Sequence, residues 1–175
     1  TAYNAFWKSY FKYRSLFLAL RRWVSGRPKV ILKPTMSLRS FGDLQRETFF
    51  GYYDVTPFSE NEKLLLAMQK PFVPGKETAD KAITVGYFSL ADPASRFIRI
   101  GDTTTWCWQQ GCRLMWHPQY PSDRILYNRV VDHDYGSIVY DLRQDTIVRE
   151  YEFPIYDIDS QGKKVASLNF SRLGR

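Results

Sequence analysis

Three short motifs bring aromatic, amide and charged side chains together: GYYD at residues 51–54, QQG at 109–111 and LNFSR at 168–172. Aromatic rings can stack on sugar rings, amides can bond hydroxyl groups, and a guanidinium can pair with a uronate or a phosphate. These motifs predict a ligand-binding site. Its candidate residues are Tyr52, Tyr53, Asp54, Trp108, Gln109, Gln110, Asn169 and Arg172.

The same residue types also have a structural use. Aromatic side chains can wedge between packed sheets, and polar side chains can satisfy the open ends of strands. Both interpretations of each candidate residue therefore stay open at the level of sequence.

Other residues that could do chemistry are few. Asp132, His133 and Asp134 suggest a metal site or a general base, but successive residues of an extended chain point in opposite directions, which favours a solvated turn. Cys107 and Cys112, in a chain with two histidines, fit neither a zinc site nor a disulfide framework, so we expect reduced, packed thiols. We identify no catalytic residue and no metal ligand.

Runs of apolar and β-branched residues between turn residues predict strands throughout the second part of the chain. A turn at Ser59 to Asn61 should join the first two. The expected strands are 48–55, 63–69, 84–90, 96–101, 112–116, 124–131, 137–142 and 146–153.

The strand pattern repeats. An apolar run after a polar turn begins at Leu64, Ile125 and Val165, which are 61 and 40 residues apart, and the segment around Phe88 is echoed 52 residues later around Tyr140. Repeats of 40 to 60 residues built from short strands are typical of β-propeller blades. We therefore predict an all-β fold, a β-propeller with two blades and part of a third in this chain. A β-sandwich is the alternative.

The positive charge is concentrated at the beginning of the chain. Of 25 basic residues nine lie in residues 1–42, which contain no acidic residue, and 16 basic face 18 acidic residues in the remainder. Residues 1–26 predict an amphipathic helix, 27–47 a basic linker, and 48–175 the incomplete propeller. The apolar face of the helix carries Tyr3, Phe6, Tyr10, Tyr13, Phe17, Leu20 and Val24.

An aromatic and basic amphipathic helix of this kind, over residues 2–24, can lie on an anionic membrane surface, or it can pack on the β domain or a partner. Its longest uncharged run, 15–20, is too short to cross a bilayer. Nucleic acid is a weaker candidate partner, because the β domain that would hold a strand is nearly neutral.

GYYD at 51–54, TPFS at 56–59, QQG at 109–111 and LNFSR at 168–172 together resemble the first part of bacterial propeller proteins related to oligogalacturonate lyase, which are found with surface-polysaccharide biosynthesis genes. The resemblance covers about residues 48–175. It implies a seven-bladed propeller, of which this chain would supply the beginning as a fragment. In the lyase, His and Gln side chains hold a manganese ion beside a catalytic His, and the resemblance implies that most such positions would lie beyond Arg175.

These observations together predict a cytoplasmic, membrane-associated propeller whose cleft binds a glycan precursor or a partner enzyme without chemistry of its own. The alternative is a polysaccharide lyase, in which a base removes the proton next to a uronate carboxylate and a metal or an arginine stabilises the developing charge.

Overall fold

A computed structural model describes residues 38–42, 45–71, 82–92 and 94–172 of the 175-residue chain. The strands all belong to one compact unit, Ser40–Arg175. The expected helix over residues 2–24 and most of the linker before the first strand lie outside the described residues.

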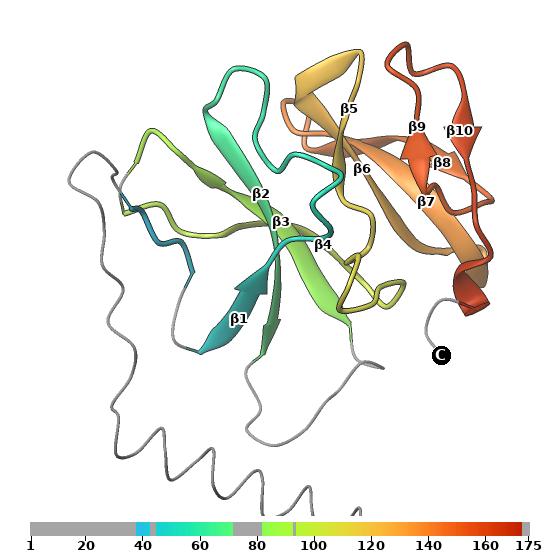
Figure 1. Ribbon diagram of the computed structural model, residues 1–175, viewed down its shortest axis with the longest axis horizontal. Coiled ribbons are helices and arrows are strands. Elements are labelled where there is room, and N and C mark those ends of the chain that lie inside the picture. The colour runs from blue at the N-terminus through green and yellow to red at the C-terminus, as the bar shows by residue number, and fades with distance from the viewer. Residues whose placement is uncertain (1–37, 43–44, 72–81, 93, 173–175) are drawn as a thin grey trace, which may run out of the picture. The chain divides into compact units, whose positions relative to one another are not determined.

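The first sheet is a four-stranded antiparallel meander in the order β1-β2-β3-β4 (Figure 1). Its strands are β1 (Arg46–Phe49), β2 (Leu64–Pro71), β3 (Ile83–Ser89) and β4 (Ile98–Thr103). The two central strands are the most apolar, and their alternating side chains give the sheet one face that is buried against the second sheet.

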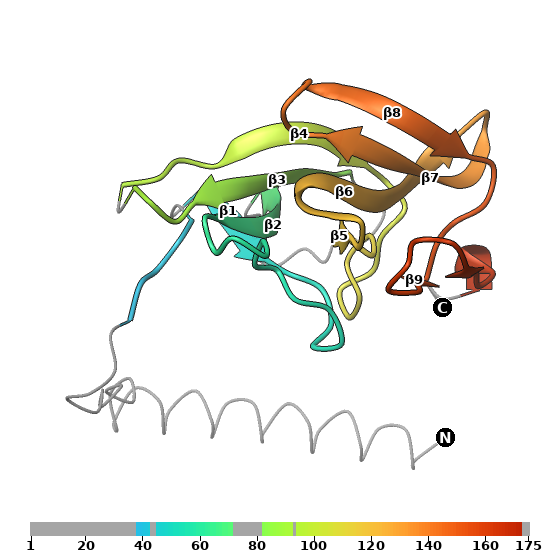
Figure 2. The same ribbon diagram turned by 90° about the horizontal axis from the view of Figure 1, so that it is seen from above.

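The second sheet has the same order, β5-β6-β7-β8, and a short hairpin, β10-β9, follows it. Its strands are β5 (Met115–His117), β6 (Tyr120–Val131), β7 (Asp134–Asp141) and β8 (Thr146–Tyr151). The hairpin is formed by β9 (Asp157–Ile158) and β10 (Val165–Ala166), and a single 3-10 turn, Phe170–Arg172, follows it. Figure 2 shows the two larger sheets side by side, with β9 beyond the second one.

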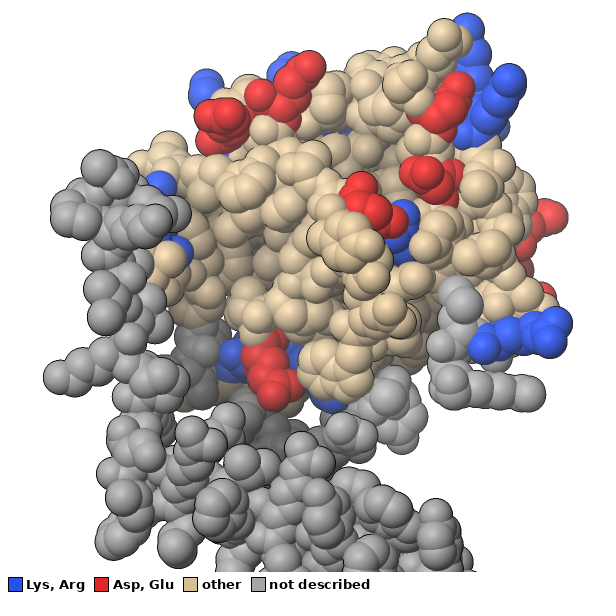
Figure 3. Space-filling model, in the orientation of Figure 1, with Lys and Arg blue, Asp and Glu red and all other residues tan. Residues whose placement is uncertain are grey.

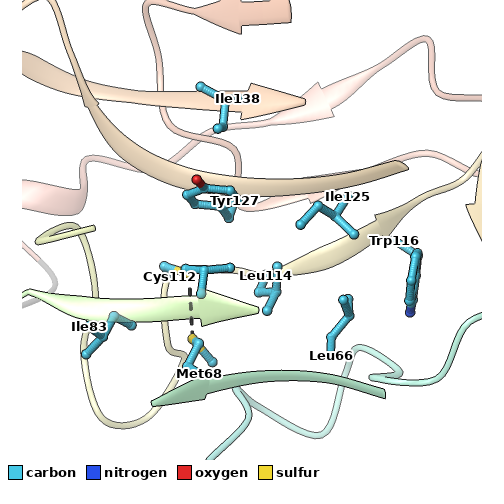
Figure 4. Packing of buried hydrophobic residues seen from close by; sticks show 10 residues of the cluster. Leu66, Met68, Ile83, Cys112, Leu114, Trp116, Ile125, Tyr127 and Ile138 are labelled. Atoms are coloured by element: carbon cyan, nitrogen blue, oxygen red, sulfur yellow. Dashed lines mark hydrogen bonds between the residues drawn. The ribbon is translucent and has the colours of Figure 1, made fainter. Parts of the chain in front are cut away.

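The main core fills the space between the first and the second sheet. Leu66 and Met68 of β2 pack with Ile125 and Tyr127 of β6, and the thiol of Cys112 donates to the sulfur of Met68 at 3.6 Å (Figure 4). Leu66, Met68 and Ile125 are at most 1% exposed, and fully burying such a side chain contributes about 1.5 to 3 kcal/mol. The core therefore holds the two sheets face to face.

The other face of the second sheet carries a smaller core. Leu126 of β6 and Val139 of β7 alternate with the main-core residues of the same strands, and they pack on Met115 and on Ile155, which precedes β9. The second sheet is therefore apolar on both faces, with the first sheet on one side and the start of the hairpin on the other.

The two large sheets are copies of one pattern. Leu65 pairs with Phe88 in the first sheet, and Ile125 pairs with Tyr140 in the second. By this pairing Ile125 corresponds to Leu65, which is 60 residues before it. The expected correspondence with Leu64, at a spacing of 61, is wrong by one residue. A one-residue change matters in a strand, because it exchanges the two faces.

The turn before β2 recurs before β10. The N–H of Ser59 donates to the carbonyl of Leu64, and the N–H of Asp159 donates to the carbonyl of Lys164. In both turns a side-chain oxygen of the first residue, Ser59 or Asp159, accepts from the backbone N–H groups of the residues four and five positions later. The expected turn at Ser59 to Asn61 is confirmed, and its copy joins β9 to β10 in the hairpin.

The all-β prediction is confirmed for the described residues, which form antiparallel sheets of four, four and two strands and contain no α-helix. Six expected strands correspond to β2, β3, β4, β6, β7 and β8. Two expectations are wrong: the strand over 48–55 ends at Phe49, and the strand over 112–116 is replaced by Met115–His117. In both places the chain leaves the sheet and forms a loop.

Candidate functional site

Two loops, residues 50–57 and residues 107–111, stand next to one another and carry most of the candidate residues; we call them the site loops. The first follows β1, and the second is closed by paired backbone hydrogen bonds between Cys107 and Gly111. A Cβ atom on Gly51 would lie 2.6 Å from the carbonyl oxygen of Gln110, so only glycine permits this approach of the two backbones.

A buried arginine fixes the first loop to the rest of the unit. Both carboxylate oxygens of Asp54 accept from Nη1 of Arg113, at 3.1 and 2.9 Å, and the Arg113 side chain is 1% exposed. Its Nε donates to the carbonyl of Tyr156 at 2.7 Å, and the guanidinium lies 4.2 Å from the centre of the Tyr156 ring. Asp54 is therefore a structural partner of Arg113.

Sequence reasoning missed Arg113. The only available signal was a single arginine within the otherwise apolar run at 112–116, where a charged side chain needs a partner if it is buried. The partner is 59 residues away along the chain, and no local pattern indicates it.

Tyr52 and Tyr53 form the outer part of the first loop. Their ring centroids are 4.2 Å apart, and Tyr53 is 86% exposed. A hydrogen bond with Tyr53 raises the pKa of the Tyr52 hydroxyl, with burial as the second cause, while a hydrogen bond with Gln109 opposes the increase. The GYYD and QQG motifs thus meet at this point. Because its pKa is raised, the Tyr52 hydroxyl is neutral at physiological pH.

Gln110 points the other way, towards the hairpin. Its amide nitrogen donates to the Tyr156 hydroxyl at 3.4 Å, and its amide oxygen is buried without a hydrogen-bond partner among the described residues. Gln109 is exposed at the surface of the same loop. Of the two amides, Gln109 is therefore the one that can reach a ligand from solution.

Trp108 belongs to an aromatic group at the base of the second loop. Its ring lies 5.2 Å from Phe49 and 5.0 Å from Trp106, between centroids. The ammonium of Lys70 lies 4.4 Å from the Trp108 centroid and 5.2 Å from the Trp106 centroid. These rings stabilise the buried Lys70 cation, and Trp108 stays 42% exposed, so one part of it can still stack on a ligand.

Asn169 and Arg172 lie in the turn after β10. The N–H of Arg172 donates to the carbonyl of Asn169 at 3.1 Å, and Arg172 is exposed. No hydrogen bond or ion pair joins Arg172 to the site loops in the part of the chain that is described. The structure thus brings Tyr52, Tyr53 and Gln109 together at the surface. Asp54 and Gln110 instead make internal contacts, with Arg113 and with Tyr156.

The Asp132-His133-Asp134 motif is a hairpin turn between β6 and β7. Asp132 and His133 have positive φ values of 46° and 71°, which are typical of a type I′ turn, and both are exposed. Within the described ranges, no group of three or more His, Cys, Asp and Glu residues is arranged to hold a metal ion.

Both cysteines are free, and Cys112 is buried. Burial raises the pKa of its thiol to about 12, so the thiolate that a nucleophile or metal ligand requires does not form near neutral pH. This agrees with a packed thiol.

No model of a known protein family matches the sequence, no curated protein is significantly similar to it, and no solved structure is significantly similar to its fold. No helix within the described residues is long and apolar enough to span a membrane.

Proposed function

We propose that the chain is part of a β-propeller that binds a glycan, with the site loops at the inner edge of the first two blades. The two meanders share one strand order, one face of the first packs on the opposite face of the second, and the hairpin begins a third unit with the same turn. This is how successive propeller blades are related. Propellers bind ligands at the ends of their inner strands, where β1 and β5 are interrupted by the site loops.

The observation that carries the proposal is the exposure of Tyr53 beside Tyr52 and Gln109. An aromatic ring that is 86% exposed can be reached from solution, and here it stands beside an amide and a hydroxyl that suit sugar hydroxyl groups. The ion pair between Asp54 and Arg113 holds the loop that presents it. This arrangement supports recognition of a ligand.

Titration with oligosaccharides tests the proposal. Because the resemblance favours acidic glycans, tetragalacturonate is the first probe, and a neutral tetrasaccharide is the second. Tyr53→Ala should weaken binding severalfold by removing the stacking surface, and Tyr135→Ala is the matched control, because Tyr135 is exposed in the turn region between β6 and β7. Equal affinity for both variants and the original chain would contradict the proposal.

Arg172 is tested in the same titration. If its guanidinium pairs with an anionic sugar group, Arg172→Ala should weaken binding of tetragalacturonate by on the order of 1.5 to 3 kcal/mol, the scale of a hydrogen bond to a charged group. The neutral tetrasaccharide should bind as before. Unchanged binding of both probes would leave Arg172 outside the site.

We further propose that residues 2–24 attach the protein to an anionic membrane surface. The observation that favours this is the combination of an aromatic face with basic residues and no acidic residue. A peptide of residues 1–29 should sediment with anionic vesicles, less so as salt increases, and replacing Phe6, Trp7, Phe11 and Phe17 by Ser should abolish binding. A peptide that stays in the supernatant at low salt would contradict this.

A further inference from the structure

The face of the first sheet opposite the main core is hollowed. An open cavity of about 560 Å³ lies on it. Its lining includes Gln69 and Thr84, the middle of a row of paired polar residues that continues to Thr48 on one side and Asp102 on the other. The amide of Gln69 donates to the Thr48 hydroxyl at 3.1 Å. This part of the lining is thus polar and fixed by the sheet itself.

The next row across the same face has small residues on the two central strands. Ala67 pairs with Gly86, and Gly86 pairs with Arg99. The Phe97 ring lies directly over Gly86, where a Cβ atom would meet it at 2.5 Å. Phe97 in turn packs edge-on against Phe88, with centroids 5.3 Å apart. Gly86 thus makes room for the Phe97 ring, and the rings of Phe97 and Phe88 form an apolar wall of the cavity.

Three arginines surround the cavity: Arg46 of β1, Arg96 of the loop before β4, and Arg99 of β4. Arg99 pairs with Asp102, while neither Arg46 nor Arg96 has an acidic partner within salt-bridge distance among the described residues. The pKa of the Asp102 carboxyl is lowered by Arg99 first and also by a hydrogen bond with Thr84, and the charge of Arg46 makes the smallest contribution. The described residues that surround the cavity therefore carry an excess of positive charge.

The loop that carries Arg96 and Phe97 is held at its base. The Ser95 hydroxyl accepts from the N–H of Ser89, the last residue of β3, at 2.7 Å, and the N–H of Ser95 donates to the carbonyl of Asp92 at 3.1 Å. Arg96 and the apolar wall are thus positioned by the sheet edge, which favours a built site over a chance grouping of surface arginines.

The equivalent face of the second sheet is built differently. There, Tyr127 pairs with Ile138 at the positions that correspond to Ala67 and Gly86, and both are at most 2% exposed in the main core. Large apolar residues are what a face covered by another sheet uses. The first sheet has the small residues Ala67 and Gly86 at these positions, with polar and cationic side chains around them, which suits a ligand better than an apolar layer.

We propose that this cavity binds a phosphate ester carried on a ring, with Arg46 and Arg96 on the phosphate and Phe97 against the ring. Guanidinium groups bind phosphate through paired, charge-assisted hydrogen bonds, and the cavity volume is within the range of small-molecule sites. This site is on the opposite face of the first sheet from the main core and does not depend on glycan binding by the site loops.

Calorimetric titration of the full chain tests this site. The probes are ADP and glucose 1-phosphate, which present a flat aromatic ring and a sugar ring, with adenosine as the uncharged control. Arg46→Gln and Arg96→Gln should each lower the affinity for the better phosphate probe about tenfold or more. Preference for ADP would assign a nucleotide and preference for glucose 1-phosphate a sugar phosphate; either supports the proposal.

Asp102→Asn is the variant that separates a binding role from a structural one. It removes a negative charge and releases Arg99, so it should raise affinity severalfold, whereas a structural role predicts no gain. Arg149→Gln is the matched control, because Arg149 is an exposed arginine of β8 over Tyr151. No phosphate binding at millimolar concentration, or an equal loss in Arg149→Gln, or binding of adenosine as tight as ADP, would overturn the proposal.

Discussion

Asn128 joins three parts of the molecule through four hydrogen bonds. Its N–H donates to the carbonyl of Cys112, and its carbonyl accepts from the Thr103 hydroxyl at the end of β4. Its side chain both donates to and accepts from the backbone of Ile155, at 2.9 and 2.8 Å. Asn128 is 1% exposed, so at the residue scale it ties the first sheet, β6 and the start of the hairpin together without access to water.

Replacing Asn128 by Ala should destabilise the protein by about 2 to 4 kcal/mol, because it leaves the N–H and the carbonyl of Ile155 buried without partners. Urea denaturation measures this, and Gln144→Ala, at an exposed position in the turn before β8, is the control. A loss below about 0.5 kcal/mol, the range of ordinary surface changes, would show that water replaces the amide.

His117 should make stability depend on pH. Burial, and secondly the charge of Arg124, lowers its pKa, and its Nδ1 accepts from the N–H of Gln119, which requires a neutral ring. The folded state therefore binds fewer protons than the unfolded state below the ordinary pKa of about 6.5. Stability is complete above that pH and decreases as the pH falls below it.

Denaturation at pH 8 and at pH 5.5 measures the effect. His117→Gln should reduce the difference in unfolding free energy between the two pH values. His133→Gln, at the exposed hairpin turn, should leave the difference as it is in the original chain. The same reduction in both variants would show that the buried ring is not the source.

At the scale of elements, the two central strands of each four-stranded sheet could be predicted from sequence, and the first strand of each could not. β2, β3, β6 and β7 contain the longest apolar and β-branched runs, because both of their edges are paired and at least one of their faces is covered. β1 and β5 are short, since the chain turns out of the sheet into the site loops. That departure depends on Gly51 against Gln110 and on Arg113 with Asp54, contacts between residues far apart in sequence.

The arrangement of the candidate site could also be predicted only in part. The motifs indicated which segments carry it, and Tyr52, Tyr53 and Gln109 do meet. Periodicity could not indicate that Asp54 and Gln110 make internal contacts, because their partners, Arg113 and Tyr156, lie far away in the sequence.

The β6–β7 turn allows a direct test at this scale. Asp132 and His133 both occupy the left-handed region that Asn-Gly prefers in two-residue hairpins. Changing Asp132→Asn together with His133→Gly should stabilise the protein by about 0.5 to 1.5 kcal/mol. Thermal denaturation measures it. A loss of stability would indicate that this turn has contacts beyond its own backbone.

At the scale of the whole described unit, charge and apolar surface are distributed in a way that favours local sites. Figure 3 shows small groups of acidic and basic side chains separated by larger uncharged areas on the face that it presents, and no continuous basic surface. Binding is thus expected at defined places: the site loops on one hand, and the cavity on the outer face of the first sheet on the other.

Indole NMR during a glycan titration tests the central claim, that the site loops bind carbohydrate, most directly. The chain has five tryptophans, of which Trp108 is 42% exposed in the second site loop and Trp116 is buried, with its Nε1 donating to the carbonyl of Pro57. Saturating tetragalacturonate or the neutral tetrasaccharide should shift the Trp108 indole signal more than that of Trp116, which is buried at the end of the first site loop. A Trp108 signal that does not move while a glycan is bound, or that moves no more than Trp116, would contradict the account.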